Sequence, residues 1–230
     1  MTMSVHAPGW TSHDIWRRPR HAERRVRAGH AVWYEPGKRA LDLAISLAAL
    51  PVVLVVVAIC VVAIKIESPG PALFRQERTG KGGRRFRMFK LRTMVPNAQE
   101  LKARYMHLNE HRYPDFKITN DPRVTRCGRV LRKTSLDELP QLFNVILGDM
   151  TLVGPRPTSF GAETYRLWHT ARLEVKPGLT GLWQVSGRAD LDFDDRLRLD
   201  IAYIRNRSLR LDVQILVRTF TAVLSARGAN

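Results

Sequence analysis

The sequence is poor in cysteine, with Cys60 and Cys127 the only two among 230 residues. Cys60 lies inside a long apolar run, so a disulfide is not expected and a reducing compartment fits the chain. The cysteine and histidine spacings that are typical of zinc sites are missing as well. No apolar stretch stands near the first residue, which argues against a secretory signal peptide. These absences exclude a disulfide-bonded secreted domain and a zinc-bound domain.

Acidic residues are also scarce: 21 Asp and Glu face 38 Lys and Arg, for a formal net charge of +17. Such an excess indicates a polyanionic partner, which can be nucleic acid, anionic lipid or a phosphorylated substrate. A codon bias toward arginine is the plain alternative for part of the excess. Aromatic residues make up only 8% of the chain, and few of them alternate with basic residues. This pattern argues against a nucleic-acid binder.

A long apolar run is the strongest single feature of the sequence. It covers residues 40–64, ALDLAISLAALPVVLVVVAICVVAI, and carries no charge from Leu43 to Ile64. The run meets the roughly 20 residues that a helix needs to span a bilayer. We therefore expect a membrane helix over residues 38–67 and a single domain over residues 68–230. Residues 1–37 are arginine-rich and predict a poorly ordered lead-in, which either rests on anionic lipid or has no role.

The flanks of this run bear on how it enters the membrane. Lys38 and Arg39 precede it and Lys65 follows it, and basic flanks favour the cytoplasmic side. A straight span would place one flank outside, whereas a re-entrant helix keeps both inside. Pro51 offers a kink because it lacks an N–H and crowds the preceding turn. Proline also occurs in true spans, so both topologies stay open, with the re-entrant one preferred.

A β-hairpin is predicted directly after the membrane helix. Ala72–Arg78 and Arg84–Arg92 have the character of two short strands, joined by a glycine-containing turn over Thr79–Gly83. The polar face of the hairpin is basic, which suits either a solvated or lipid-facing surface or a phosphate-binding wall. We favour Lys90 and Arg92 for phosphate binding because they end the hairpin.

Two adjacent acids, Asp137 and Glu138, stand before an apolar helical pattern in the stretch SLDELPQLFNVILGDM, residues 135–150. Ser135 and Glu138 have capping-box spacing, which gives the plain structural interpretation of Glu138. Pro140 argues against it, because proline fits best at the start of a helix, and the helix should then begin near Leu139. The catalytic interpretation is a site for a divalent cation such as Mg²⁺, or one ligand and one nucleophile.

Two loops follow that could bind anions. In TLVGPRP, residues 151–157, Pro155 and Pro157 fix the backbone on either side of Arg156, so that its guanidinium can meet a phosphate at little ordering cost. The plain alternative is a surface turn. The glycine-rich stretch KPGLTGLWQVSGR, residues 176–188, ends in Arg188 and could bring backbone N–H groups to an anion.

The remaining segments predict helices. Pro96–His111 is a modest helix candidate, and residues 119–133 form a basic amphipathic stretch that leads into the acid pair. Asp190–Arg207 is helix-compatible, and we expect its acids to form a solvated face. Leu209–Leu224 predicts a closing amphipathic helix that packs on the core or lies in the membrane interface. The acids that we expect on the solvated face of Asp190–Arg207 are Asp192, Asp194, Asp195 and Asp200.

Five ordered motifs together resemble the bacterial sugar transferases, which are monotopic phosphoglycosyl transferases. The motifs are KRALDLAISLAALP at 38–51, PGPALFRQERTG at 69–80, FKLRTM at 89–94, NDPRVTRCGRVLRKTSLDELPQLFNVILGDMTLVGPRP at 120–157 and KPGLTGLWQVSGR at 176–188. The likeness covers roughly residues 38 to 225, and five ordered motifs over that length make it specific. The short lead-in resembles that of the compact members of the family. One departure is Leu50, where many members have a serine before the kink proline.

The resemblance implies a fold and a reaction. The fold would be helix-rich α+β, with an N-terminal re-entrant membrane helix kinked at Pro51, a small β-hairpin and interfacial amphipathic helices around a single catalytic domain. The enzyme would sit on the cytoplasmic face of the bacterial inner membrane and take a UDP-sugar, usually of glucose or galactose in compact members. With Mg²⁺, it would pass the sugar-1-phosphate to undecaprenyl phosphate and release UMP.

The resemblance also implies roles for single residues. Asp137 matches the nucleophile that forms a covalent phosphosugar, and Glu138 matches the metal-associated acid. Arg156, between Pro155 and Pro157, and Arg188 match substrate-phosphate or nucleotide-binding positions, and Lys90 and Arg92 match the basic end of the hairpin. A non-catalytic membrane scaffold for polysaccharide assembly is the alternative. The sequence leaves the exact sugar and the oligomeric state open, including a homo-oligomer.

Overall fold

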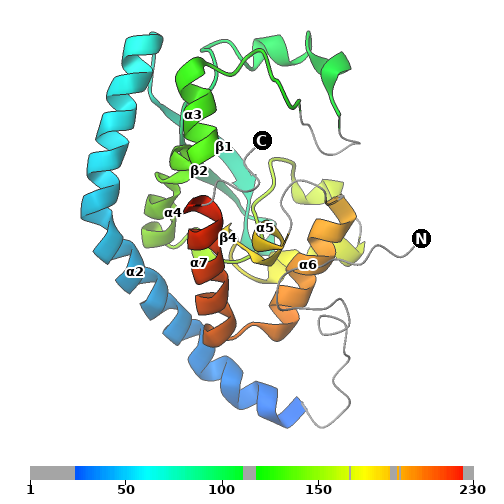
Figure 1. Ribbon diagram of the computed structural model, residues 1–230. Coiled ribbons are helices and arrows are strands. Elements are labelled where there is room, and N and C mark those ends of the chain that lie inside the picture. Colours follow the sequence, from blue (N-terminus) through cyan, green and yellow to red (C-terminus); the bar gives the residue numbers. More distant parts are fainter. Residues whose placement is uncertain (1–23, 111–117, 166, 187–190, 192, 225–230) are drawn as a thin grey trace.

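The longest element of the fold is a single apolar helix, α2, from Arg24 to Glu67. The structure is a computed structural model that describes residues 24–110, 118–165, 167–186, 191 and 193–224. Trp33–Glu67 is the one stretch of these residues that forms a helix long and apolar enough to cross a membrane, with a mean hydropathy of 3.2 over its most apolar 18 residues. The predicted apolar helix is therefore confirmed as a helix of spanning length. It runs along one edge of the molecule (Figure 1).

The start of α2 corrects the predicted boundary. The helix begins at Arg24, so the second part of the expected lead-in, residues 24–37, is helical; residues 1–23 lie outside the described residues. Pro36 and Pro51 both lie inside the helix. The two ends of α2 point in different directions in Figure 1. That the bend arises at Pro51 stays a prediction, made because proline removes a backbone hydrogen bond.

The β-hairpin is confirmed. Strand β1, Leu73–Thr79, pairs antiparallel with β2, Arg85–Leu91, so that Gln76 faces Met88. The turn contains the 3₁₀ segment η2, Lys81–Gly83, in which Gly82 and Gly83 have φ of 64° and 78°. Only glycine adopts such angles without strain, so the two glycines set where the chain reverses.

The helix predicted over Pro96–His111 is wrong. This segment holds only two short 3₁₀ turns, η3 (Glu100–Lys102) and η4 (Met106–Leu108), within its described residues. Leu108 is 41% exposed, so the expected apolar face is not buried against the core. A short helix without such packing is only marginally stable in water.

The stretch around the acid pair forms three successive helical segments. The predicted basic amphipathic stretch contains α3, Arg126–Thr134, which Thr125 caps by accepting from the Gly128 N–H. Ser135 then takes a left-handed conformation with φ of 59° and is followed by the 3₁₀ turn η5, Leu136–Glu138. Helix α4 covers Gln141–Leu147, directly after Pro140. Ser135 thus ends α3, and its side chain makes no capping hydrogen bond, which removes the capping-box interpretation of Glu138.

The rest of the chain builds a small parallel sheet covered by helices. Strand β3, Thr151–Val153, pairs with β4, Gly178–Thr180. Between them lie the 3₁₀ turns η6, Ala162–Thr164, and η7, Leu167–Glu174. Helices α5 (Leu182–Val185), α6 (Phe193–Asn206) and α7 (Leu209–Leu224) follow. The predicted bounds of the closing helix are therefore confirmed.

Apolar side chains from β2, α4, β3 and the last two helices meet in the main core. Val145, Met150 and Val153 lie at its centre with at most 1% of their surfaces exposed. Tyr203 of α6 and Ile215 of α7 complete the cluster. Burial of each such side chain contributes roughly 1.5–3 kcal/mol to folding. The outer side of α2 differs, since Val55, Ile59 and Ile66 are 62–81% exposed, as expected for a surface that faces lipid.

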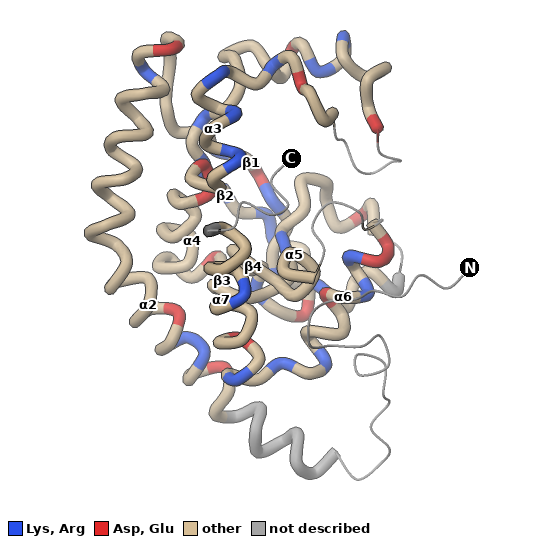
Figure 2. Tube along the Cα trace, viewed as in Figure 1, with Lys and Arg blue, Asp and Glu red and all other residues tan. Residues whose placement is uncertain are grey.

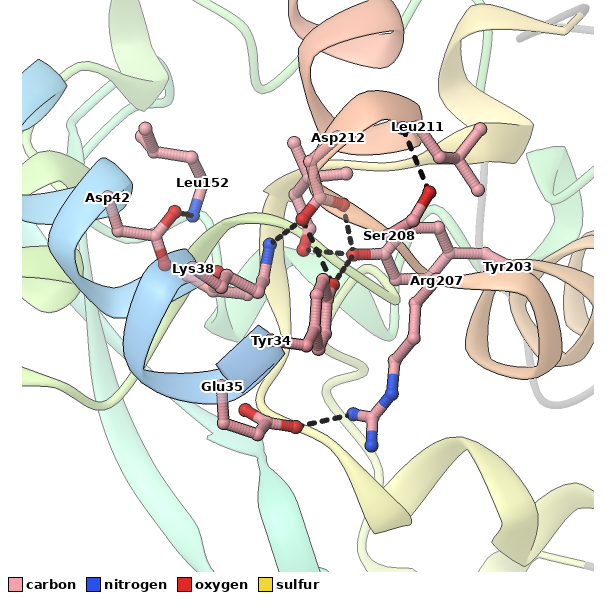
Figure 3. Close-up of polar contacts among 12 residues, drawn as sticks. Tyr34, Glu35, Lys38, Asp42, Leu152, Tyr203, Arg207, Ser208, Leu211 and Asp212 are labelled. Carbon is pink, nitrogen blue, oxygen red and sulfur yellow. Dashed lines mark hydrogen bonds and ion pairs between the residues drawn. The ribbon is translucent and has the colours of Figure 1, made fainter. Parts of the chain in front are cut away.

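Polar contacts tie the first part of α2 to the domain (Figure 3). Lys38 Nζ lies 2.9 Å from the Asp212 carboxylate of α7, and both side chains are almost fully buried. Arg39 donates to the carbonyls of Val145 and Ile146 at 2.6 and 2.9 Å, where the negative end of the α4 dipole favours a cation. The expected basic flank of the membrane helix is therefore engaged with protein.

The last turn of α2 is tied to the same domain. The Glu67 carboxylate accepts from the N–H groups of Arg126 and Cys127 at 2.8 and 3.0 Å, so it caps α3. Just beyond the helix, Ser68 and Pro69 accept from Arg92. One folded domain thus holds both ends of the apolar segment.

Candidate active site

The acid pair lies in the 3₁₀ turn η5, at the junction of α3, α4 and β2. Asp137 is 7% exposed, and the preceding Leu136 packs on the cluster around Leu131. Because Pro140 opens α4, both acids precede the regular helix, as predicted. Their side chains are therefore presented at the positive end of a helix, which favours negative charge.

Glu138 is held by two cations. Lys90 Nζ donates to its Oε1 at 2.9 Å, and Arg156 donates to both of its carboxylate oxygens. Burial acts to raise the pKa of the Glu138 carboxyl, but the charges and hydrogen bonds of Arg156 and Lys90 outweigh it and hold the pKa well below its usual range. These contacts therefore favour the ionised form of Glu138.

Asp137 has the opposite environment. Burial raises its pKa, the charge of Lys90 at 3.8 Å opposes the rise, and the neighbouring Glu138 adds to it. The net effect is a pKa above the ordinary value of an aspartate. A carboxylate that is poorly solvated and weakly paired is a better nucleophile than one fixed by two cations. The structure thus gives the two acids different environments: two cations hold Glu138, whereas Asp137 is buried and weakly paired.

Lys90 reaches the acids because Asn144 joins β2 to α4. The Asn144 amide accepts from the Phe89 N–H at 3.0 Å and donates to the Arg87 carbonyl at 2.8 Å. Its side chain is fully buried, where an unpaired amide would be costly. Sequence reasoning missed this positioning residue. The signal was a single amide on the apolar face of a predicted helix.

Arg156 leaves β3 in a fixed turn, as predicted. The Gly178 N–H donates to the Pro155 carbonyl at 2.9 Å, and the Gly154 N–H donates to Thr180 O at 2.8 Å. A Cβ on Gly154 would lie 2.8 Å from the Lys176 carbonyl, so only glycine fits there. Arg172 donates to the Arg156 carbonyl. The guanidinium is therefore placed by main-chain bonds as well as by Glu138.

Two other arginines, Arg92 and Arg188, were also predicted to bind phosphate. Arg92 lies just past the end of β2 and is 8% exposed; it donates to the Pro69 carbonyl at 2.6 Å and to Ser68 at 2.8 and 2.9 Å. Arg92 therefore holds the chain just after the end of α2, and none of these hydrogen bonds involves Glu138. Arg188 lies outside the described residues, so its role stays a prediction.

Three arginines near the site were not singled out from the sequence. The charge of Arg132 acts on Asp137, and its Nε donates to Thr93 at 2.9 Å. Arg78 on β1 donates to the Pro157 carbonyl at 3.3 Å. Arg172 pairs with Asp200 at 2.9 Å, which corrects the expectation that Asp200 is solvated: the carboxylate is 2% exposed. Such long-range pairs leave no mark in local sequence patterns.

The acid pair also decides where a divalent cation would fit. Within the described residues, no three His, Cys, Asp or Glu side chains gather into a metal cage. Mg²⁺ commonly uses one or two carboxylates and completes its shell with water and substrate phosphates, so Asp137 and Glu138 suit it. An ion bound to Glu138 would have to share that carboxylate with Arg156 and Lys90.

Comparison of the sequence with known proteins identifies relatives of this chain. The undecaprenyl-phosphate galactose phosphotransferase of Salmonella typhimurium is 49% identical over 165 residues, 70% of this chain and 35% of that protein. The exopolysaccharide production protein ExoY of Rhizobium meliloti is 40% identical over 201 residues, which cover 84% of this chain and 87% of that protein. The UDP-glucose:undecaprenyl-phosphate glucose-1-phosphate transferase of Caulobacter vibrioides is 41% identical over 203 residues, which cover 84% of this chain and 71% of that protein.

The chain matches only part of several of these relatives. The chain spans less than half the length of the Salmonella protein and of matched proteins from Streptococcus agalactiae and Erwinia amylovora, at 35%, 43% and 41%. The family model described as bacterial sugar transferase matches residues 33–226. That range contains the apolar helix, the hairpin, the acid pair and the arginine turn. The chain belongs to the bacterial sugar transferase family.

Proposed function

We propose that this protein transfers a sugar-1-phosphate from a UDP-sugar to undecaprenyl phosphate and releases UMP. The observation that carries the proposal is that the two adjacent acids differ in environment. Arg156 and Lys90 bind Glu138, whereas the neighbouring Asp137 has a raised pKa. Relatives whose names state transfer of galactose or glucose phosphate to undecaprenyl phosphate support the reaction class.

The first step uses Asp137 as the nucleophile. One carboxylate oxygen attacks the β-phosphorus of the UDP-sugar, the bond to the bridging oxygen breaks, and UMP leaves with that oxygen and its electron pair. The product is a sugar phosphate joined to Asp137 as an acyl phosphate. Arg156 and Lys90 lie where negative charge develops on the transferring group, and such fixed charges are usually a large catalytic contribution.

The second step returns the carboxylate. A phosphate oxygen of undecaprenyl phosphate attacks the same phosphorus, and the Asp137 oxygen leaves as the carboxylate. The lipid then carries a diphosphate-linked sugar. Glu138 would help to hold Mg²⁺, which would supply further positive charge at the transferring phosphate. Since no proton has to leave the attacking phosphate when it is ionised, the site needs no histidine base.

We place the domain on the cytoplasmic face of the bacterial inner membrane, with α2 entering and leaving on that side. The support is that Lys38 and Arg39 near one end of the apolar segment and Glu67 at the other contact the same domain. A straight span would separate the two ends by about 30 Å of hydrocarbon. The exposed apolar side of α2 then faces lipid tails, and the lipid acceptor reaches the site from the membrane.

The sugar is proposed to be galactose or glucose, because relatives of this chain carry these sugars in their names. The product would begin an exopolysaccharide, capsule or O-antigen repeat, in line with the name of the Rhizobium relative.

The test is UMP release by the purified full chain in nanodiscs with Mg²⁺, undecaprenyl phosphate and a panel of UDP-sugars. The proposal expects lipid-dependent UMP release with UDP-galactose or UDP-glucose and loss of that release in Asp137→Asn. Release that persists in Asp137→Asn would refute the nucleophile. Absence of release with every donor would favour the alternative of a non-catalytic scaffold.

A further inference from the structure

The surface around Arg156 is hollowed beyond the residues that contact the acid pair. Arg156 borders two hollows in the described part of the chain, with about 490 and 200 Å³ of open space. The larger one is bounded by the Pro157–Phe160 segment, by Arg172 of η7, by Trp183 of α5 and by the first turns of α6. Of the two, it is the one that has room for a group larger than an ion.

Flat side chains gather in one wall of this cleft. The Arg196 guanidinium lies 5.5 Å from the centre of the Trp183 ring and 5.9 Å from that of Phe193. The ring centres of Phe160 and Phe193 are 5.6 Å apart. Aromatic rings and arginine planes are the surfaces on which nucleic-acid bases stack. All of these side chains are half-buried, so they stay accessible from the cleft.

The other wall is cationic. The cleft is lined by four arginines, Arg78, Arg156, Arg172 and Arg196, and by one acid, Asp200, which pairs with Arg172. Arg78 donates to the neutral oxygens of Pro157 and Gln76, and its buried Nε has no hydrogen-bond partner among the described residues. Positive charge thus exceeds negative charge in the described lining, and one of the lining arginines has an unpaired donor. Both features call for an anionic ligand.

The position of the cleft narrows the choice of ligand. It shares Arg156 with the acid pair, so a group in the cleft can be joined to a phosphate at Asp137. Helix α5 and the first turns of α6 lie away from the apolar part of α2 (Figures 1 and 2), which does not suit a lipid tail. Among the described residues, the lining contains no Asn or Gln, its one carboxylate is paired, and only Thr158 and Ser159 add hydroxyl groups, which leaves few partners for the hydroxyl groups of a sugar.

We infer that this cleft binds the nucleoside end of the donor, with the pyrimidine base against Trp183, Phe193 and Arg196 and the α-phosphate near Arg78. The inference rests on the proposed function and deepens it, because it assigns the base and the α-phosphate of the donor to particular residues of the cleft. The β-phosphate then lies between Arg156 and Asp137, and UMP, as the leaving group, departs through the open mouth of the cleft.

The test measures UDP binding to the full chain in detergent by equilibrium dialysis, without sugar or lipid, together with kinetics. Arg196→Ala and Trp183→Leu are expected to weaken UDP binding about ten-fold, in the range of base stacking. The KM for the UDP-sugar should rise by a similar factor, while the KM for undecaprenyl phosphate stays unchanged. Trp183→Phe, which keeps a ring, should retain most of the affinity and reports on folding.

Arg198→Ala is the matched control, because Arg198 lies two residues along α6, is exposed and pairs with Asp195 at 2.9 Å. It should bind UDP as the wild type does. Unchanged UDP affinity in both cleft variants would overturn the inference while leaving the reaction intact. A raised KM for the lipid alone would assign the cleft to the acceptor. A wild type that binds UDP through these residues but transfers no sugar would refute the proposed function and keep the cleft as a nucleotide site.

Discussion

Arg156 donates to both carboxylate oxygens of Glu138, with Nη1 lying 3.1 Å from Oε2. This two-point ion pair joins the turn after β3 to the 3₁₀ turn that carries the acids. In the described part of the chain, Asp137 forms its one ion pair with Lys90, at 3.8 Å. The contrast between a doubly held Glu138 and a loosely held Asp137 is the basis of the catalytic assignment.

Replacement of Arg156 by lysine should lower turnover by about 10- to 100-fold. Lysine keeps the charge but cannot form the two parallel hydrogen bonds, and a hydrogen bond to a charged group contributes about 1.5–3 kcal/mol. The measurement is kcat and KM for UMP release, with circular dichroism to show that the fold is kept. Arg84→Lys in the exposed hairpin turn is the control. Equal rates for the two variants would show that the fork is not needed.

The Lys38–Asp212 pair should be essential for stability. Lys38→Met leaves a buried carboxylate without its cation and should cost about 3–5 kcal/mol in the free energy of unfolding. Asp212 also accepts from Tyr34 and Tyr203 at 2.9 and 2.6 Å (Figure 3), so the whole α2–α7 contact should loosen. Thermal unfolding in detergent measures the effect.

The neighbouring Glu35–Arg207 pair provides the comparison for Lys38→Met. It spans the same two parts of the chain at 2.7 Å, but the Glu35 side chain is 56% exposed. Exposed pairs contribute about 0–1 kcal/mol, so Glu35→Gln should hardly change the unfolding temperature. Similar losses in Glu35→Gln and Lys38→Met would contradict the account of α2 anchoring.

The rate should fall on acidification through the raised pKa of Asp137. Attack needs the ionised carboxylate, so activity is present above this pKa and is lost as the pH drops through it. Glu138 has a lowered pKa and stays ionised over the same range. Because Lys90 opposes the rise, Lys90→Met should move the acid limb of kcat to higher pH, whereas Lys90→Arg should not. An acid limb that moves to lower pH in Lys90→Met would contradict the assignment.

The two ends of the membrane segment should be accessible from the same side. Single cysteines at Glu35 and Lys65, in a chain with Cys60 and Cys127 replaced by serine, should both react with an impermeant maleimide only in inside-out vesicles. The reason is that the contacts of Lys38 and Glu67 fix both ends to one domain. Labelling of one site from the periplasmic side only would establish a spanning helix.

Local patterns predicted the elements whose physical cause is local. The hairpin followed from the glycines at its turn, the membrane helix from its apolar length, and α7 from its amphipathic spacing. The acid pair was found because Pro140 places it ahead of the regular helix, and the Arg156 turn because Pro155 and Pro157 restrict the backbone on both sides of the arginine. The contact between Glu138 and Arg156, across eighteen positions in the sequence, was not predicted, since the family resemblance implied only that both belong to the site.

Sequence reasoning fell short where tertiary contacts decided the outcome. Lys90 and Arg92 look equivalent in the sequence, but β2 ends at Leu91 and Arg92 contacts Ser68 and Pro69, so phosphate binding by Arg92 stays a prediction. Asp200 looked solvated, yet Arg172 on another element draws it into the interior. The Pro96–His111 segment has helical periodicity but nothing to bury its apolar face against. Neither partner choice nor the available packing surface can be read from one stretch of sequence.

The most direct test of the central claim is detection of the covalent intermediate. The protein is incubated with UDP-galactose or UDP-glucose and Mg²⁺ in the absence of undecaprenyl phosphate, quenched and analysed by intact mass and peptide mapping. The account predicts one added hexose phosphate on Asp137, its disappearance on addition of undecaprenyl phosphate, and no adduct in Asp137→Asn. Lipid-dependent turnover without any adduct, or an adduct on another residue, would contradict it.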